Sequence, residues 1–153
     1  TALESGMVRL VSTVGPRQTG RYGMVVTRFV HQALRNEPLT IYGDGNQTRC
    51  FCAVTGVVDG IIALSEHPEA FGKVFNLGST EEVSIRHLAD LIVTITGSSS
   101  PVEFVSYDIA YEEGFEDMQR RVPAISRANE LVGFAPSLGL DDIIRSVIDD
   151  LQG

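Results

Sequence analysis

Arginines on three glycine- or proline-containing segments are the residues whose types and spacing suggest chemistry. The segments are 15–18 (GPRQ), 42–49 (YGDGNQTR) and 120–123 (RRVP). A guanidinium group is planar and permanently charged, and its paired N–H donors can hold two phosphate oxygens at once. Arg49, Arg120 and Arg121 are therefore candidates for binding a diphosphate.

The same arginines have a second interpretation that needs no ligand. In a chain with a net charge of -8, Arg49 and Arg121 can be solvated or can pair with nearby acids such as Asp44 or Asp117. Exposed ion pairs of this kind are common on protein surfaces. From residue types alone, this structural interpretation is the stronger of the two.

The composition is that of a soluble globular protein. Of the 153 residues, 43% are apolar and 21% are charged. No apolar run approaches the ~20 residues that a membrane-spanning helix needs. The acidic balance, without a basic stripe along a predicted helix, argues against a nucleic-acid surface. The first six residues resemble no targeting segment. We therefore expect a cytoplasmic protein with no membrane or nucleic-acid partner.

Neither the cysteines nor the histidines form a metal-binding pattern. Cys50 and Cys52 are too close along an extended segment for an unstrained disulfide, and their spacing is not Cys-x-x-Cys. We predict that both are buried and behave as small apolar residues. The histidines, His31, His67 and His87, fall on or beside predicted helices without other ligands at metal spacing, so we expect no metal site.

Strand-like and helix-like segments alternate along the chain, which predicts an α/β fold. Strands are expected at 7–14, 39–42, 73–77 and 102–105, and helices at 24–36, 57–64, 85–95 and 140–151. The first strand is apolar and β-branched, so we expect it to be buried. Ser84 is predicted to cap the third helix and Gly97 to end it. The acidic, aperiodic stretch 108–118 is predicted to be a mobile loop.

Four segments occur in an order and spacing that resemble a known family. They are 9–18, 38–49, 75–79 and 121–136. Together they are similar to the C-terminal half of the extended short-chain dehydrogenase/reductases, which include NAD-dependent nucleotide-sugar epimerases, decarboxylases and 4,6-dehydratases. The resemblance implies the last strands of a Rossmann domain joined to a small α/β substrate-binding domain.

In this family, the resemblance implies, an N-terminal half binds NAD with a Gly-x-x-Gly-x-x-Gly loop and carries a catalytic Tyr-x-x-x-Lys pair. Neither motif occurs here. The single lysine, Lys73, follows Glu69 at that spacing, and Gly20-x-x-Gly23 lacks a third glycine. We therefore expect residues 1–153 to be one inactive C-terminal fragment without catalytic or cofactor-binding residues. NAD and a homodimer are expected for the intact parent only.

The resemblance also assigns candidate substrate-binding residues. It places Arg49 and Arg121 at the two arginines that contact the diphosphate of a nucleotide sugar, and it makes that role the stronger interpretation. Arg120 is the adjacent alternative to Arg121. Tyr42 is expected at the wall of the base and ribose pocket or in the core, and Ser12 is expected near the sugar.

Other family positions have structural roles or depart from the pattern. Asn76 is expected to brace the backbone, Gly15 and Pro16 to shape the turn beneath the sugar, and Arg17 to anchor that loop. The departures are Ser12 in place of asparagine, Thr27 in place of proline, Ala53 in place of an aromatic residue or histidine, and Gly56 and Ala124 in place of acids. Together these departures suggest an altered sugar specificity or a degenerate site.

Three hypotheses remain open. The first is the substrate-binding part of a UDP-glucose 4-epimerase-like enzyme. The second is the same part of a UDP-glucuronate decarboxylase or nucleotide-sugar 4,6-dehydratase. The third is a non-catalytic nucleotide-sugar-binding module that descends from such an enzyme.

Overall fold

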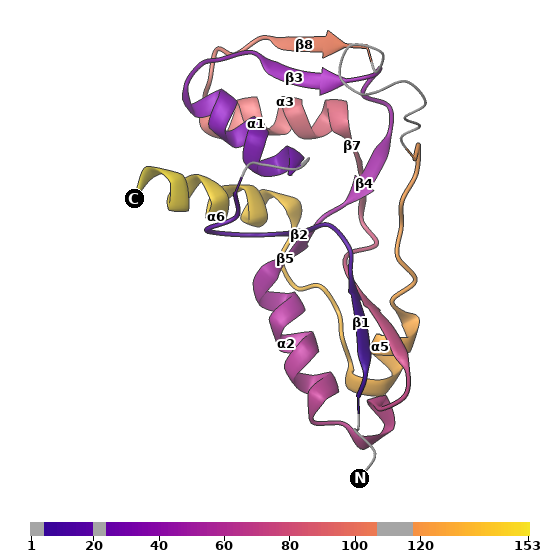
Figure 1. Ribbon diagram of the computed structural model, residues 1–153. Helices are drawn as coiled ribbons and strands as arrows, with labels where there is room; N and C mark the ends of the chain where they lie inside the picture. The colour runs from indigo at the N-terminus through magenta and orange to yellow at the C-terminus, as the bar shows by residue number, and fades with distance from the viewer. Residues whose placement is uncertain (1–4, 20–23, 107–117) are drawn as a thin grey trace.

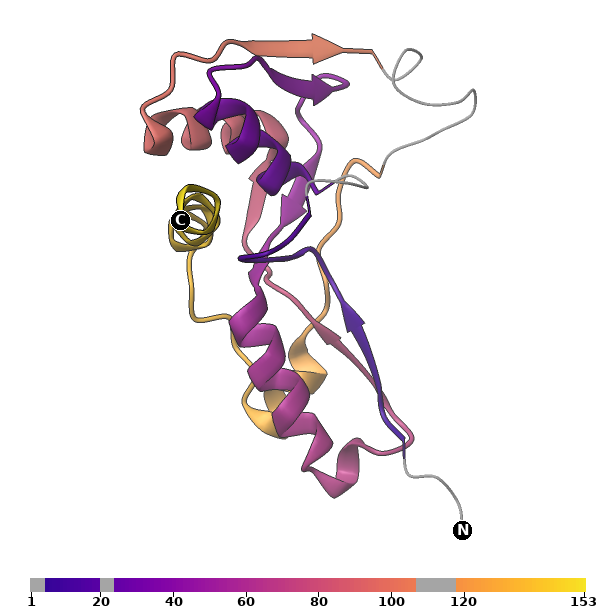
Figure 2. The same ribbon diagram turned by 60° about the vertical axis from the view of Figure 1, so that its left-hand side comes forward.

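The computed structural model describes residues 5–19, 24–106 and 118–153, and it shows an elongated molecule with two packed parts (Figure 1). The upper part in Figure 1 contains helices α1 (Val25–Leu34), α3 (Ile85–Thr96) and α6 (Leu140–Gln152) and strands β3 (Leu39–Tyr42) and β8 (Val102–Val105). Seen from the side, the two strands lie above α1 and α3, and α6 lies below them (Figure 2). The strand pair therefore covers one side of a helical layer.

The lower part is built around one parallel strand pair. It contains β1 (Met7–Leu10), β6 (Val74–Leu77), α2 (Val54–Ser65), α5 (Ser126–Val132) and a short 3-10 helix, Pro68–Ala70. Short strands connect the two parts: β2 (Thr13–Val14), β4 (Thr48–Cys50), β5 (Cys52–Ala53) and β7 (Glu82–Ser84). β1 pairs with β6, β2 with β5 and β3 with β8, all in parallel, whereas β4 and β7 are antiparallel.

Two hydrophobic clusters hold these parts together. The first is formed by buried residues of α1, α3, α6 and β3, among them Phe29, Ile41 and Leu88. The second joins α2, α5 and β6 through residues that include Phe75 and Phe134. In α1, α3 and α6, the apolar residues at the predicted helical spacing are the ones buried in the first cluster. Helix α5 was not predicted from the sequence.

Local signals place the ends of the main helices. The Ser84 hydroxyl accepts a hydrogen bond of 3.1 Å from the amide of His87, and Gly97 ends α3 with a left-handed backbone at φ 65°. Both predictions are confirmed. Helix α1 ends before Asn36, which has φ 51°. In α6, Asp141 and Asp142 lie in the first turn, where the positive end of the helix dipole favours carboxylates.

The prediction of one buried strand at 7–14 is wrong. β1 ends at Leu10, and a positive φ of 45° at Ser12 separates it from β2. Within the described residues, β1 pairs on one side only, with β6, and Met7 and Leu10 are 58% and 52% exposed. Val8 packs against the second hydrophobic cluster, whereas Met7 and Leu10 are left uncovered. Most of the predicted loop at 108–118 lies outside the described residues.

Candidate functional site

Arg49 lies in the middle of β4, and its guanidinium reaches the segment that carries the other two candidate arginines. Its Nη1 atom donates hydrogen bonds of 2.7 Å to the carbonyl oxygens of Thr48 and Met118. The amide of Thr48 donates to the Gln119 carbonyl at 2.8 Å. Residues 118–120 therefore lie directly beside β4, although they are far from it in the sequence.

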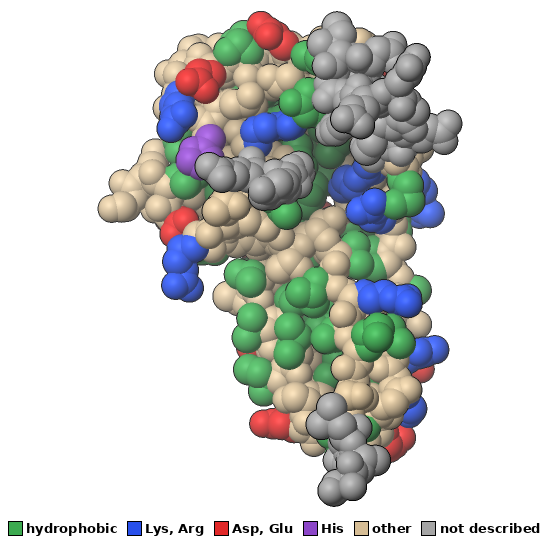
Figure 3. Space-filling model, viewed as in Figure 1, with side chains coloured by type: hydrophobic (Ala, Val, Ile, Leu, Met, Phe, Trp, Pro, Cys, Tyr) green, Lys and Arg blue, Asp and Glu red, His purple; other side chains and the backbone are tan. Residues whose placement is uncertain are grey.

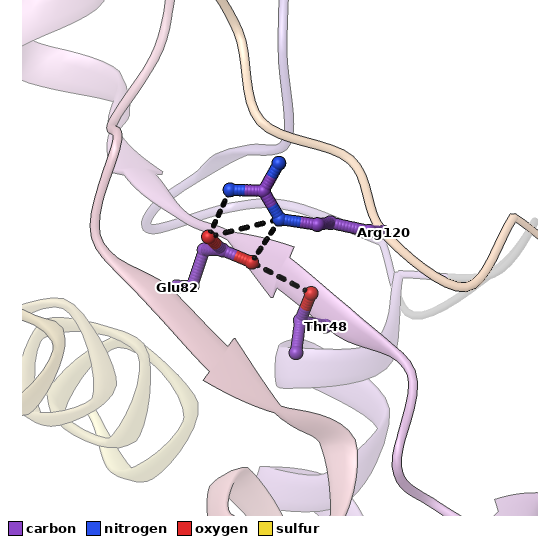
Figure 4. Close-up of polar contacts among 3 residues, drawn as sticks. All are labelled: Thr48, Glu82 and Arg120. Carbon is purple, nitrogen blue, oxygen red and sulfur yellow. Dashed lines mark hydrogen bonds and ion pairs between the residues drawn. The ribbon is translucent and has the colours of Figure 1, made fainter.

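Arg120 is held by an acidic residue of β7 (Figure 4). Its Nη2 atom lies 2.6 Å from Oε1 of Glu82, and its Nε atom donates to Oε1 and Oε2 at 3.2 Å and 3.0 Å. The hydroxyl of Thr48 donates to Oε2 at 2.9 Å. Glu82 therefore holds Arg120 bidentately, with Thr48 as a second donor.

This ion pair stabilises the charged forms of both partners. The hydrogen bonds from Arg120 and then Thr48 lower the pKa of the Glu82 carboxyl below its ordinary value of 4.5. The same pairing raises the pKa of Arg120. Both side chains remain in contact with solvent, with 68% of Arg120 and 31% of Glu82 exposed. Screening by water therefore weakens the pair.

Arg121 is exposed and, among the residues that the structure describes, makes no hydrogen bond or ion pair. Thr48 pairs with both Ser84 and Arg120, so β4 lies between β7 and the 118–120 segment. Paired residues share a face, and consecutive residues of extended backbone point to opposite faces. As bridge partners, Thr48 and Arg120 lie on the same face of β4. Figure 3 shows basic side chains gathered beside β4.

Tyr42, at the end of β3, packs against an arginine of α1. The guanidinium carbon of Arg28 lies 4.7 Å from the centroid of the Tyr42 ring, and Nη2 of Arg28 donates to the Thr40 carbonyl at 3.0 Å. Gln47 donates to the Tyr42 carbonyl at 2.8 Å. These contacts give Tyr42 a packing role, and its contact with a base or ribose stays a prediction.

Asp44 and Asp117 are the two acids that the sequence suggests as partners of Arg49 and Arg121. The Asp44 carboxylate accepts hydrogen bonds from the amide and the side chain of Asn46, at 2.9 Å and 2.8 Å. These bonds, the backbone one first, lower the pKa of Asp44 below its ordinary value of 3.8. Asp44 thus closes its own turn. Asp117 lies outside the described residues.

Ser12 lies at the bend between β1 and β2. Its carbonyl accepts a hydrogen bond of 3.1 Å from the amide of Cys52. The following loop is braced by Gln18, which donates to the Thr13 carbonyl at 2.9 Å. The amide of Arg17 donates to Asp150 of α6 at 2.6 Å, so the loop is anchored there through its backbone. Sugar contact by the Ser12 hydroxyl stays a prediction.

Asn76 braces the backbone, as predicted. Its Nδ2 atom donates to the carbonyl of Ala124 at 3.0 Å. Beside it, Gly78 permits close approach, because an added Cβ would lie 3.1 Å from Pro123 and from Val11. The end of β6 therefore supports the segment that follows Arg121.

Glu82 and Thr48 are the site residues that sequence reasoning missed. Two acids, Glu81 and Glu82, are adjacent at the start of the short strand β7. No local pattern distinguishes which of them faces Arg120, which is 38 residues away from Glu82. Glu82 also lies outside the four segments that carry the family resemblance, whereas Thr48 lies inside one of them.

The other predicted residues have structural environments. Cys50 and Cys52 are free thiols with 0% and 1% exposure, and burial raises the pKa of both. The described parts of the chain contain no group of three or more residues able to hold a metal ion. Within the same parts, no helix is long and apolar enough to cross a membrane.

The helices and strands form a mixed α/β fold of the extended short-chain dehydrogenase/reductase class. The sequence profile described as "NAD dependent epimerase/dehydratase family" matches residues 2–78. The chain belongs to this family. The fold class expected from the sequence is thereby confirmed.

Two sequence relatives are decarboxylases. The chain is 35% identical over 143 residues to UDP-N-acetyl-alpha-D-glucosaminuronate decarboxylase of Bacillus cytotoxicus, which covers 93% of this chain and 44% of that protein. It is 37% identical over 146 residues to UDP-glucuronic acid decarboxylase 1 of Xenopus tropicalis, and the matched region covers 95% of this chain and 33% of that protein. The chain therefore spans less than half the length of these relatives.

Two solved structures with similar folds are epimerases. The UDP-glucuronic acid 4-epimerase of Bacillus cereus, in complex with UDP-glucuronic acid and NAD, matches 96% of this chain and 45% of its own, with a TM-score of 0.84 and 28% identity. The UDP-glucose 4-epimerase of Thermotoga maritima, solved with UDP-glucose, matches 98% of this chain and 46% of its own, with a TM-score of 0.86 and 26% identity.

Proposed function

We propose that this chain forms the UDP-sugar-binding part of an NAD-dependent nucleotide-sugar enzyme. The observation that carries the proposal is the convergence of Arg49 and the 118–121 segment, because Arg49 bonds to the Met118 carbonyl and Thr48 pairs with Arg120. Arg49 and Arg121 would hold the diphosphate from one face of β4. To contact phosphate through Nη1, Arg49 would exchange its bonds to the two carbonyls.

We further propose that the sugar is a hexuronic acid. The two decarboxylases are named for uronic acid sugars, and the Bacillus cereus epimerase was solved with UDP-glucuronic acid. Decarboxylation and 4-epimerisation both fit this substrate, and the decarboxylase relatives favour the former. A UDP-glucose 4-epimerase-like activity is the second candidate, supported by the TM-score of 0.86 with the Thermotoga maritima enzyme.

NAD belongs, in this proposal, to the intact parent. The sequence of this chain has no Gly-x-x-Gly-x-x-Gly loop and no Tyr-x-x-x-Lys pair, so its residues do not fit the cofactor. We expect the 153-residue chain to turn over neither UDP-glucose nor UDP-glucuronic acid when NAD is added. Release of CO2 or interconversion of the C4 epimers, followed by NMR, would refute this.

Titration calorimetry with UDP, UDP-glucose and UDP-glucuronic acid tests the binding proposal. A charge-assisted hydrogen bond contributes about 1.5 to 3 kcal/mol, so Arg49→Ala and Arg121→Ala should each weaken UDP binding by roughly 10- to 150-fold. Arg145→Ala is the matched control, because Arg145 is an exposed arginine on α6. Equal UDP affinity in all three variants would show that the diphosphate assignment is wrong. Tighter binding of UDP-glucuronic acid than of UDP-glucose would support the uronic acid.

A further inference from the structure

Arg120 and Arg121 are neighbours in the sequence with different environments. Three hydrogen bonds join Arg120 to Glu82, whereas Arg121 makes none within the described part of the chain. The family resemblance leaves both as candidates for the diphosphate. If hydrogen bonds within the protein hold one of these arginines, the other remains available to bind the ligand.

Glu82 reaches Arg120 across an intervening strand. The register places Glu82 opposite Cys50 and Ser84 opposite Thr48, so Glu82 and Thr48 are diagonal neighbours on one face. Arg120 pairs with Thr48 from the other side of β4. The Glu82 carboxylate therefore lies diagonally over β4 and bonds to both Thr48 and Arg120 (Figure 4).

This cross-strand contact fixes more than one side chain. In extended backbone, holding one residue on one face directs the next residue to the other face. With Arg120 held on the Thr48 face, Arg121 is directed to the Arg49 face. If the bridge to Thr48 shifted by one residue, Arg121 would take the place of Arg120, because side chains of extended backbone alternate between the two faces.

We propose that Glu82 is a positioning residue, which holds Arg120 across β4 and thereby keeps Arg121 beside Arg49 for the diphosphate. The identity of the ligand rests on the proposed function, whereas the contacts of Glu82 with Thr48 and Arg120 do not depend on it. Glu82 itself touches no ligand, and Arg120 serves as an anchor. Of the two adjacent arginines, Arg121 is the phosphate contact.

The first test measures the position of the 118–121 segment without a ligand. Amide hydrogen exchange is followed at Thr48, whose N–H bonds to the Gln119 carbonyl at 2.8 Å. Glu82→Ala should raise the exchange rate at this amide about threefold or more, because the segment loses its anchor. Glu81→Ala removes an equal charge from the preceding residue and should leave the rate unchanged. Equal rates in the two variants would overturn the proposal.

The second test separates positioning from direct contact by exchanging the two charges. Glu82→Ala should weaken UDP binding about threefold to fivefold, the size that one exposed, multiply bonded ion pair supports. Arg120→Glu should weaken it further by repelling Glu82. The double variant Glu82→Arg with Arg120→Glu re-forms the pair and should restore the affinity to within about twofold of wild type. If the double variant binds as weakly as Arg120→Glu, Arg120 itself contacts the ligand and the proposal is wrong.

The outcomes distinguish this proposal from the proposed function. If the wild-type chain shows no affinity for UDP, the proposed function fails, and the exchange rate at Thr48 still decides whether Glu82 positions the segment. If Arg49→Ala and Arg121→Ala lose UDP while Glu82→Ala keeps full affinity, the positioning role fails and the proposed function stands.

Discussion

Gly60 lies in the middle of α2, where a single added methyl group would meet the second hydrophobic cluster. A Cβ at this position would lie 2.7 Å and 3.1 Å from two ring carbons of Phe134, and 3.3 Å from Cδ1 of Leu77. Phe134 is 6% exposed and Leu77 is 0% exposed. The ring therefore has little space into which it can move when Gly60 is replaced by alanine.

Two opposing effects decide the stability of Gly60→Ala. Alanine in a helix interior is favoured over glycine by up to about 1 kcal/mol, because glycine loses more backbone freedom on folding. Forcing an extra methyl group into a packed core costs about 1 to 3 kcal/mol. Since the nearest contact is far below an ordinary carbon–carbon distance, we expect the packing effect to exceed the helix effect. The free energy of unfolding should fall by about 1 kcal/mol.

Gly56, on the same helix, provides the matched control. Apart from neighbouring backbone of the helix, no atom of the described residues lies within 4 Å of a Cβ added there, so Gly56→Ala should raise the free energy of unfolding by about 0.5 kcal/mol. The two variants should differ in Tm by roughly 3 to 6 °C. Urea and thermal unfolding followed by far-ultraviolet circular dichroism measures both quantities. Phe134→Leu should reduce the cost of Gly60→Ala, and a Gly60→Ala variant as stable as Gly56→Ala would refute the packing argument.

Three further predictions concern capping, pH and the thiols. Ser84→Ala should lower the free energy of unfolding by about 1 kcal/mol in urea titrations, because the amide of His87 loses its acceptor. The lowered pKa values of Glu82 and Asp44 mean that their carboxylates stabilise the fold above the ordinary values of 4.5 and 3.8 and that this contribution disappears as pH falls through the lowered folded values. The urea midpoint should therefore fall on acidification below pH 4.5, and the fall should be shallower in Glu82→Ala; an equal slope would contradict the assignment. Cys50 and Cys52, buried with raised pKa values, should resist alkylation in the native chain and react once it is unfolded in urea; rapid labelling of the native chain would contradict their burial.

The elements that sequence reasoning predicted well are those whose signals are local. The Ser84 cap, the Gly97 stop and the apolar stripe of α6 each depend on residues within one or two turns of a helix. The break at Ser12 was not predicted, because its positive φ is imposed where β2 turns to pair with β5. A serine has no strong local preference for that conformation.

The contacts around β4 were beyond local signals for a different reason. The sequence suggests Asp44 and Asp117 as partners of Arg49 and Arg121, because these acids are close to the arginines along the chain. No acid was predicted to pair with Arg120, and the structure pairs it with Glu82 on a three-residue strand. A strand of that length gives too few residues for an alternating pattern, so its register follows from tertiary pairing.

Arg121 lies between two anchors that come from different hydrophobic clusters. Upstream, Arg120 is bound by Glu82 of β7, whose neighbour Val83 is buried in the first cluster. Downstream, the carbonyl of Ala124 is bound by Asn76 of β6, a strand of the second cluster. The segment that presents Arg121 therefore depends on both parts of the molecule.

Two anchors on one short segment should be partly redundant. In Asn76→Ala, the bond of 3.0 Å to the Ala124 carbonyl is lost while Glu82 still holds Arg120, so we expect UDP affinity to fall only about threefold to fivefold. In the double variant with Glu82→Ala, neither side of Arg121 is held, and the loss should exceed the product of the two single losses. Calorimetric titration of the four proteins gives this coupling directly. A double variant that equals the simple product would mean that the anchors act independently and that Arg121 is positioned by other contacts.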